Sequence, residues 1–176
     1  MDDPDARADA AEPATGPLLL AAERQKPSAP RAPYHHALDP DHEDELLLSI
    51  GQGLALIEVS ERKSPEATVR AIAAFVDAVR AGSRRSTRDA TDAALALACL
   101  FGHQVCREHA FGWGHLRRAR SPGIVLISRD FRYVVRPRQL IERAFRDGGG
   151  VLLDYFSELG AAARLPRGSG FYAPVN

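Results

Sequence analysis

The spacing of hydrophobic positions along the chain predicts helices first. Between residues 41 and 62, apolar side chains recur at three- and four-residue steps, which is the period of one helix face. The buried stripe expected from this spacing consists of Leu47, Ile50, Leu54 and Ile57. A second helix is expected from Ser64-Pro65, a pair that suits an N-cap and a first helical position, to Gly82. Its expected buried face consists of Val69, Ile72, Phe75, Val76 and Val79.

The middle of the chain changes from a helical to a strand pattern. A third helix is expected from a cap at Ser86 to about Ala110, and it is apolar on all sides over residues 93–101, which is typical of a central core helix. Gly112 ends it. Short runs of apolar and β-branched residues then predict three strands joined by turns. These strands span residues 113–119, 123–128 and 132–135.

Two more helices complete the predicted domain. Pro137 suits the first position of a fourth helix, and the glycines at 148–150 separate that helix from a fifth. The pattern therefore predicts an α+β fold: three helices, a small three-stranded antiparallel meander, and two helices packed on one face of the sheet. We expect this single domain to span residues 39–165.

The two ends of the chain have a different composition. Residues 1–38 are rich in alanine, aspartate and proline, and prolines every few positions disfavour packed helices and strands. We expect a mostly disordered arm there, with a short apolar cluster at Leu18–Leu20, and a loose tail over residues 166–176.

Composition narrows the class of protein. The chain has 176 residues, of which 45% are hydrophobic, so one packed domain is expected. It has no apolar run long enough to cross a bilayer, its acidic N-terminus does not resemble a secretory signal, and two cysteines do not form a disulfide framework. These observations favour a cytoplasmic protein with no membrane association.

Charge is balanced overall but unevenly distributed. Acidic and basic residues number 23 each, whereas residues 1–63 hold 13 acidic and six basic residues and residues 84–146 are rich in arginine. Only Lys26 and Lys63 are lysines, as the codon supply of a GC-rich bacterial genome would give. The uneven distribution has two interpretations: the charges solvate different faces, or the basic part binds a partner.

The second half of the chain resembles an uncharacterised bacterial domain family over roughly residues 85–160. The family pattern is a glycine-containing helix that ends at a Gly-Trp step, a segment V-x-S-x-D-x-x-Y-V-V-x-P, and a helix. The matching positions are Gly102, Gly112, Trp113, Ser128, Asp130, Tyr133, Val134, Val135 and Pro137. The resemblance implies the order helix, sheet, helix and a bacterial origin, and it implies no catalytic residue.

Histidines and cysteines on the third helix do not have the spacing of a four-ligand metal site. His103 and His109 accompany Cys99 and Cys106, which lie about 10.5 Å apart along a helix axis, too far to share one ion or a disulfide. We therefore expect core cysteines, and a two-ligand half-site of His103 with Cys99 or Cys106 is the alternative.

The remaining candidate motifs do not indicate catalysis or a metal. His35, His36 and His42 precede or begin the first helix without a fixed set of further ligands. Ser128 and Asp130, with His115 on a neighbouring strand, lack the G-x-S-x-G elbow of a hydrolase, and a turn is the favoured role for the serine and aspartate. The motifs typical of nucleotide and metalloprotease sites do not occur. We expect no cofactor.

The sheet carries the candidate binding residues. If Leu116, Tyr133 and Val135 face the helices, alternation along the strands places an aromatic ring and several cationic groups on one open face. The candidate binding residues are Trp113, His115, Arg117, Arg132 and Arg136. Such a face suits an acidic protein surface or the stacked bases of single-stranded nucleic acid. A solvated face with the tryptophan under a helix is the non-functional alternative.

The sequence therefore predicts a non-catalytic protein-interaction module of the immunity or adaptor type, with an unidentified protein partner. Single-stranded nucleic-acid binding through the basic and aromatic sheet face is the alternative. An enzyme with an unfamiliar site is the third.

Overall fold

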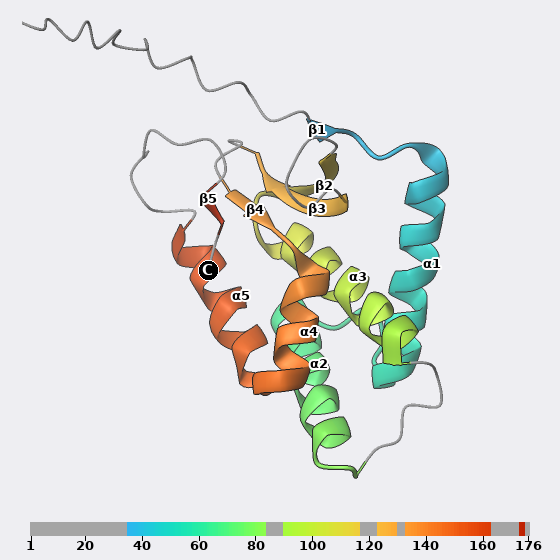
Figure 1. Cartoon of the computed structure of the whole chain (residues 1–176), viewed down its shortest axis with the longest axis vertical. Coiled ribbons are helices and arrows are strands. Elements are labelled where there is room, and N and C mark those ends of the chain that lie inside the picture. Colours follow the sequence, from blue (N-terminus) through green and yellow to red (C-terminus); the bar gives the residue numbers. More distant parts are fainter. Residues whose placement is uncertain (1–34, 84–89, 117–122, 130–132, 163–172, 175–176) are drawn as a thin grey trace, which may run out of the picture. The chain divides into compact units, whose positions relative to one another are not determined.

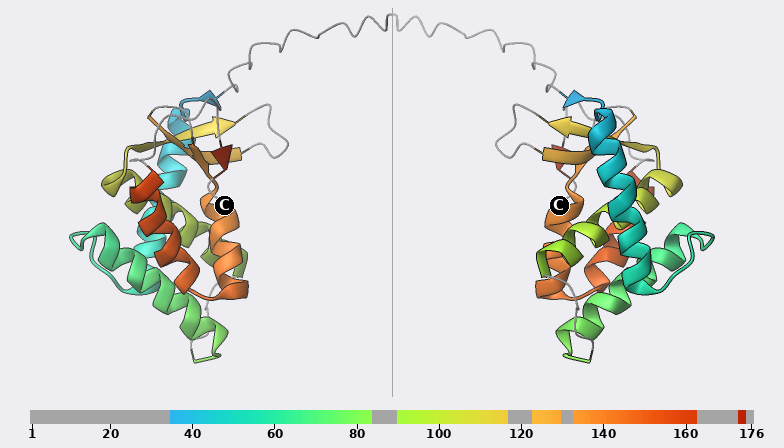
Figure 2. Two further views of the ribbon diagram at one scale, coloured as in Figure 1. Left: turned by 90° about the vertical axis from the view of Figure 1, so that its left-hand side faces the viewer. Right: turned by 90° about the vertical axis from the view of Figure 1, so that its right-hand side faces the viewer.

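The described residues of the computed structural model are 35–83, 90–116, 123–129, 133–162 and 173–174, and they confirm the predicted α+β order (Figure 1). Three helices come first: α1 (Pro40–Ile57), α2 (Pro65–Arg80) and α3 (Ala90–Glu108). The antiparallel strands β2 (Phe111–Leu116), β3 (Gly123–Ser128) and β4 (Tyr133–Val135) follow, and α4 (Pro137–Asp147) and α5 (Gly150–Ala162) complete the domain. Two side views show the sheet at one end of the helices (Figure 2).

Two short strands extend the sheet beyond the predicted meander. β1 (His35–His36) pairs with β2 in an antiparallel manner, and β5 (Ala173–Pro174) pairs with β4 in a parallel manner. The described sheet order is β1-β2-β3-β4-β5. Residues 35–36 and 173–174 thus contribute to the sheet although the sequence places them in the arm and in the tail. The rest of the arm, residues 1–34, lies outside the described residues, as do the expected cap at Ser86 and most of the tail.

Local chemistry determines where the first two helices begin and end. The Asp39 side chain accepts a hydrogen bond from the His42 backbone N–H at 3.0 Å and caps α1, and Ser64 caps α2 through the Ala67 N–H at 3.3 Å. α1 ends at Ile57, five residues before the predicted end, because Glu58 adopts the left-handed conformation with φ +56°.

No described helix is both long enough and apolar enough to cross a bilayer.

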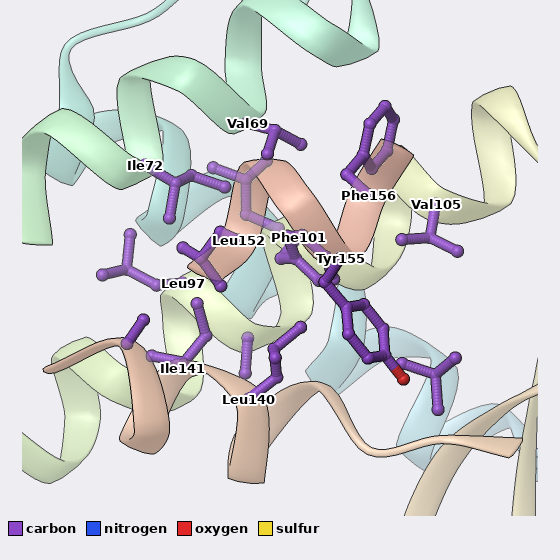
Figure 3. Packing of buried hydrophobic residues seen from close by; sticks show 14 of the residues in the cluster. Val69, Ile72, Leu97, Phe101, Val105, Leu140, Ile141, Leu152, Tyr155 and Phe156 are labelled. Atoms are coloured by element: carbon purple, nitrogen blue, oxygen red, sulfur yellow. The ribbon is translucent and has the colours of Figure 1, made fainter. Parts of the chain in front are cut away.

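α3 lies at the centre of the domain and packs against α1, α2, α4 and β2. Figure 3 shows buried side chains of α2, α3, α4 and α5 meeting in one cluster. Within it, the rings of Phe101 on α3 and Phe156 on α5 meet edge to face, with their centroids 6.3 Å apart. The expectation that residues 93–101 are buried on all sides of the helix is therefore confirmed for most of that stretch, although Leu95 is 44% exposed.

Small residues let α1 approach α3 closely. A Cβ atom added to Gly53 on α1 would lie 2.7 Å from the Ala96 carbonyl oxygen and 2.9 Å from Leu100 Cβ on α3. Both distances are shorter than van der Waals contact allows, so the helices meet at a position where only glycine fits. By contrast, a Cβ atom at Gly51 would meet nothing within 4 Å.

The close approach at Gly53 corrects the predicted buried face of α1. Leu47, assigned to the buried stripe, is 63% exposed, and Leu46 is buried in its place together with Ile50, Gly53 and Ile57. The positions of the large apolar side chains alone predicted a buried stripe through Leu47, one position along the helix from the observed Leu46. Because the contact with α3 passes through a glycine, which a hydrophobicity pattern does not register, the true buried face is rotated toward Leu46. The predicted buried face of α2 is confirmed at Val69, Ile72, Phe75 and Val76.

Two glycine substitutions on α1 should change stability in opposite directions. Gly51→Ala should raise the free energy of unfolding by up to about 1 kcal/mol, because alanine favours the helix and has open space there. Gly53→Ala should lower it by about 1–3 kcal/mol, because the added methyl group forces α1 away from α3. Urea denaturation followed by circular dichroism measures both variants. A Gly53→Ala protein as stable as Gly51→Ala would contradict the observed helix contact.

Candidate functional site

The two faces of the sheet have different neighbours. The strand register places Trp113 opposite Leu126, and Leu126 opposite Val135, so these three residues share a face. Leu126 and Val135 belong to the main core cluster formed with the helices, and Trp113 packs against that cluster. The opposite face carries a second, smaller cluster that consists of Leu116, Val125 and Ile127 with Val134 packed against it. The helices therefore lie on the Trp113 side of the sheet.

This arrangement overturns the predicted open face. The sequence placed Leu116 toward the helices and Trp113 away from them, whereas the structure has the reverse for both residues. The cause is Gly102 on α3, where an added Cβ atom would overlap the indole ring of Trp113. The absence of a side chain at Gly102 leaves the space that the indole occupies. Tyr133 and Val135 do contact the main core, as expected.

The predicted binding residues are only partly brought together. Trp113 and Arg136 line one pocket, whereas His115 lies toward α1, with its ring centroid 5.9 Å from that of His42. Arg117 and Arg132 lie outside the described residues. Of the expected binding residues that the structure describes, Trp113 and Arg136 therefore share a pocket, and His115 lies on the same sheet face as Trp113, opposite Ile124.

That pocket has a volume of about 300 Å³ and lies between α3, the sheet and the start of α4. Its lining residues are Leu95, Ala98, Cys99, Trp113, Gly123, Ile124, Arg136, Pro137, Arg138 and Gln139. Leu95 and Ile124 are 44% and 38% exposed, so they place apolar surface at the edge of the pocket. The pocket thus combines a mainly apolar wall with an open apolar edge.

The start of α4 makes one end of the pocket electropositive. Arg136 precedes the helix and Arg138 lies in its first turn, where the described residues include no acidic side chain and no side-chain cap. The first N–H groups of a helix carry partial positive charge, so the helix end adds to the arginine charges. Arg138 Nε also lies 3.0 Å from Glu142 Oε1, but this pair is exposed and its attraction is therefore weak.

The thiol at the pocket wall is not a nucleophile at neutral pH. Burial raises the pKa of Cys99 to about 11, although a hydrogen bond with Ser49 acts in the opposite direction. Burial also raises the pKa of Cys106 to about 11. Both cysteines are unbridged, partly buried and packed against the main core. They have the surroundings expected of core cysteines, and a protonated thiol is a poor nucleophile and a poor metal ligand.

The hydrolase combination is not assembled. Ser128 lies opposite Phe111, at the far end of β2 from His115, which puts about 13 Å of strand between them. The Ser128 hydroxyl accepts a hydrogen bond from the Tyr133 backbone N–H at 2.9 Å and so stabilises the connection between β3 and β4. Asp130 lies outside the described residues.

Several pocket residues were not identified as site residues from the sequence. Leu95, Cys99 and Ile124 are indistinguishable from core positions by periodicity, since each lies within an apolar run. The signal that sequence offers is the Arg136-Pro137-Arg138 step, which places two cations around the first residue of a helix. Comparison with known proteins adds no relative: no family model, curated protein or solved structure matches the chain.

The cysteines should react slowly with thiol reagents in the folded protein. With a pKa of about 11, roughly one thiol in a thousand is ionised at pH 8, compared with about one in ten at the ordinary value of 9.0. Iodoacetamide should therefore alkylate the native chain about 100-fold more slowly than the urea-unfolded chain, and the native rate should still rise between pH 9 and pH 11. Mass spectrometry of timed samples measures both rates. Equal native and unfolded rates at pH 8 would contradict the burial of these thiols.

Proposed function

We propose that the protein is a non-catalytic interaction module and that the pocket between α3, the sheet and α4 receives an apolar side chain of a partner protein. One observation carries the proposal: two exposed apolar residues, the single tryptophan of the chain and two arginines line the same pocket. Few residues usually provide most of the energy of a protein interface, and they gather at apolar pockets with aromatic or arginine neighbours.

The size of the pocket favours a side chain over a cofactor. About 300 Å³ is at the lower end of the ~300–1,000 Å³ typical of small-molecule sites. A single leucine, methionine or phenylalanine side chain of a partner would enter this volume and occupy part of it. Leu95 and Ile124 at the edge would then pack against the neighbouring residues of the partner, which removes their apolar surface from water.

The charge of the pocket favours an acidic partner segment. Arg136, Arg138 and the start of α4 surround one end of the pocket with positive charge. A carboxylate next to the inserted side chain would meet these groups at the rim, where charge complementarity contributes to specificity and to the rate of association. The partner segment is therefore an apolar residue flanked by aspartate or glutamate.

The pocket chemistry supports binding in preference to catalysis. Burial raises the pKa of Cys99 to about 11, which disfavours the thiolate that nucleophilic catalysis requires. Binding of single-stranded nucleic acid has less support from the structure than from the sequence pattern. Stacking of bases on the sheet requires Trp113 on an open face, whereas the indole packs toward α3.

Short peptides test this function. An acetylated peptide with a central leucine between aspartates should change the fluorescence of Trp113 saturably, whereas the same peptide with lysines should not. Arg138→Gln should weaken binding by about three- to tenfold, as expected for one rim charge worth about 1 kcal/mol. Arg143→Gln is the matched control, because Arg143 also forms an exposed pair within α4, with Asp147, but does not line the pocket.

Leu95→Gln provides a second test that leaves the charges intact. Leu95 is 44% exposed, so the substitution should preserve the fold while weakening peptide binding. Equal binding of the aspartate and lysine peptides, or equal losses in Arg138→Gln and Arg143→Gln, would contradict the proposed partner chemistry. A strong preference for oligonucleotides, with affinity falling steeply as salt rises, would favour the nucleic-acid alternative.

A further inference from the structure

The outward face of α1 carries an apolar side chain with acidic neighbours. Leu48 is 65% exposed, and the exposed residues Asp44 and Glu45 lie four and three positions before it. Residues at these spacings are neighbours on one helix face, so both carboxylates lie beside the leucine. These three residues, the acidic leucine patch, have the chemistry proposed for the partner segment: an apolar side chain next to aspartate or glutamate.

The helix dipole does not account for the two carboxylates of the patch. Its effect falls off within the first turn, and the acidic residues of that turn in α1 are Asp41 and Glu43. Asp44 and Glu45 lie beyond it and form no ion pair within the described part of the chain. They can therefore meet cationic groups of another molecule without giving up an ion pair within their own.

The patch lies next to the pocket of the same molecule. Ser49 of α1 forms a hydrogen bond with the thiol of Cys99, which belongs to the pocket wall. A helix turns by about 100° per residue, so Leu48 points about 100° away from Ser49, whereas Leu47 points about 160° away from it. Of the two exposed leucines of α1, Leu48 is therefore nearer to the flank of the helix that contacts the pocket wall.

We propose that a second copy of this chain supplies the partner segment, an assignment that rests on the proposed function of the pocket. Leu48 of the second copy enters the pocket, and its two acidic neighbours meet the arginines at the start of α4. Because patch and pocket adjoin, a two-fold axis between the copies lets each insert its Leu48 into the other. The chain has no net charge, so two copies do not repel each other at long range.

The two-fold contact covers the apolar edge of each pocket, formed by Leu95 and Ile124. One inserted side chain per copy, with its rim charges, makes a small interface, and small interfaces are weak and transient. Self-association therefore rises with protein concentration and competes with any other protein that uses the pocket.

Sedimentation equilibrium of the full chain, at concentrations up to about 1 mM, tests the contact. We expect an equilibrium between monomer and dimer. Leu48→Gln should weaken dimerisation by about tenfold or more, because it removes the inserted apolar side chain from both contacts. Leu47→Gln is the matched control: Leu47 is 63% exposed at the neighbouring position, and its replacement should leave the dissociation constant unchanged. Equal losses in the two variants would overturn the insertion of Leu48.

A charge exchange tests which groups meet across the contact. Glu45→Arg and Arg138→Glu should each weaken dimerisation by about tenfold, because each places like charges opposite one another. The double variant should regain most of the loss, because it restores opposite charges with the positions exchanged. A double variant that associates no better than either single variant would overturn the proposed pairing. Far-ultraviolet circular dichroism of each variant confirms that a loss of association is not a loss of fold.

The leucine–aspartate peptide separates the failure of this assignment from the failure of the proposed function. The peptide should bind to the pocket and dissociate the dimer. If it binds and the parent chain stays monomeric up to about 1 mM, the second copy is overturned as the partner and the function of the pocket stands. If the chain dimerises but the peptide neither binds nor dissociates the dimer, the pocket is not the receptor and both are overturned.

Discussion

Two glycine positions bring α3 into close contact with its neighbours, and these two contacts determine how α1 and the sheet pack. α1 reaches α3 at Gly53, and β2 reaches it at Gly102, where the indole of Trp113 occupies the space of the missing side chain. The first contact determines which face of α1 is buried, and the second determines which face of the sheet turns toward the helices. Since interiors are closely packed, neither contact tolerates an added methyl group without a shift of the backbone or of the indole.

The candidate pocket follows from the second contact. With Trp113 turned toward α3, its side chain lines the pocket together with Leu95 and Cys99 of α3 and with residues at the start of α4. Arg136 connects β4 to α4, so its position follows from both the sheet and the helix that packs on the core. The pocket is thus a consequence of how a strand packs against a helix, and its apolar wall and its cationic end come from different elements.

Much of the fold was predictable because it depends on local periodicity. The spacing of apolar residues identified five helices and the three main strands, and Ser64 and Pro137 marked helix starts through their own backbone chemistry. Which face of each helix or strand is buried was less predictable. Strand alternation separates Trp113 from Leu116, but both are apolar, and only Gly102 on another element decides which one meets the helices.

The candidate sites were the least predictable part. Of the five binding residues expected from the sequence, the structure brings Trp113 and Arg136 to one pocket and places His115 on the same sheet face as Trp113, opposite the pocket residue Ile124 and near His42 of α1. Such groupings depend on contacts between residues far apart in the chain. The two-residue strand β1 illustrates the point, because its pairing with β2 is what places His36 beside His115, and two residues are too short to produce a recognisable pattern.

The fluorescence of Trp113 reports its orientation, because the chain has one tryptophan. We expect native emission at shorter wavelength than that of the unfolded chain, with partial protection from acrylamide. Gly102→Ala should shift the emission to longer wavelength by displacing the indole, whereas Gly112→Ala, on the same strand as Trp113 and with nothing within 4 Å of an added Cβ, should not. Native emission like that of the unfolded chain, unchanged by Gly102→Ala, would show that the indole faces solvent and does not pack against α3.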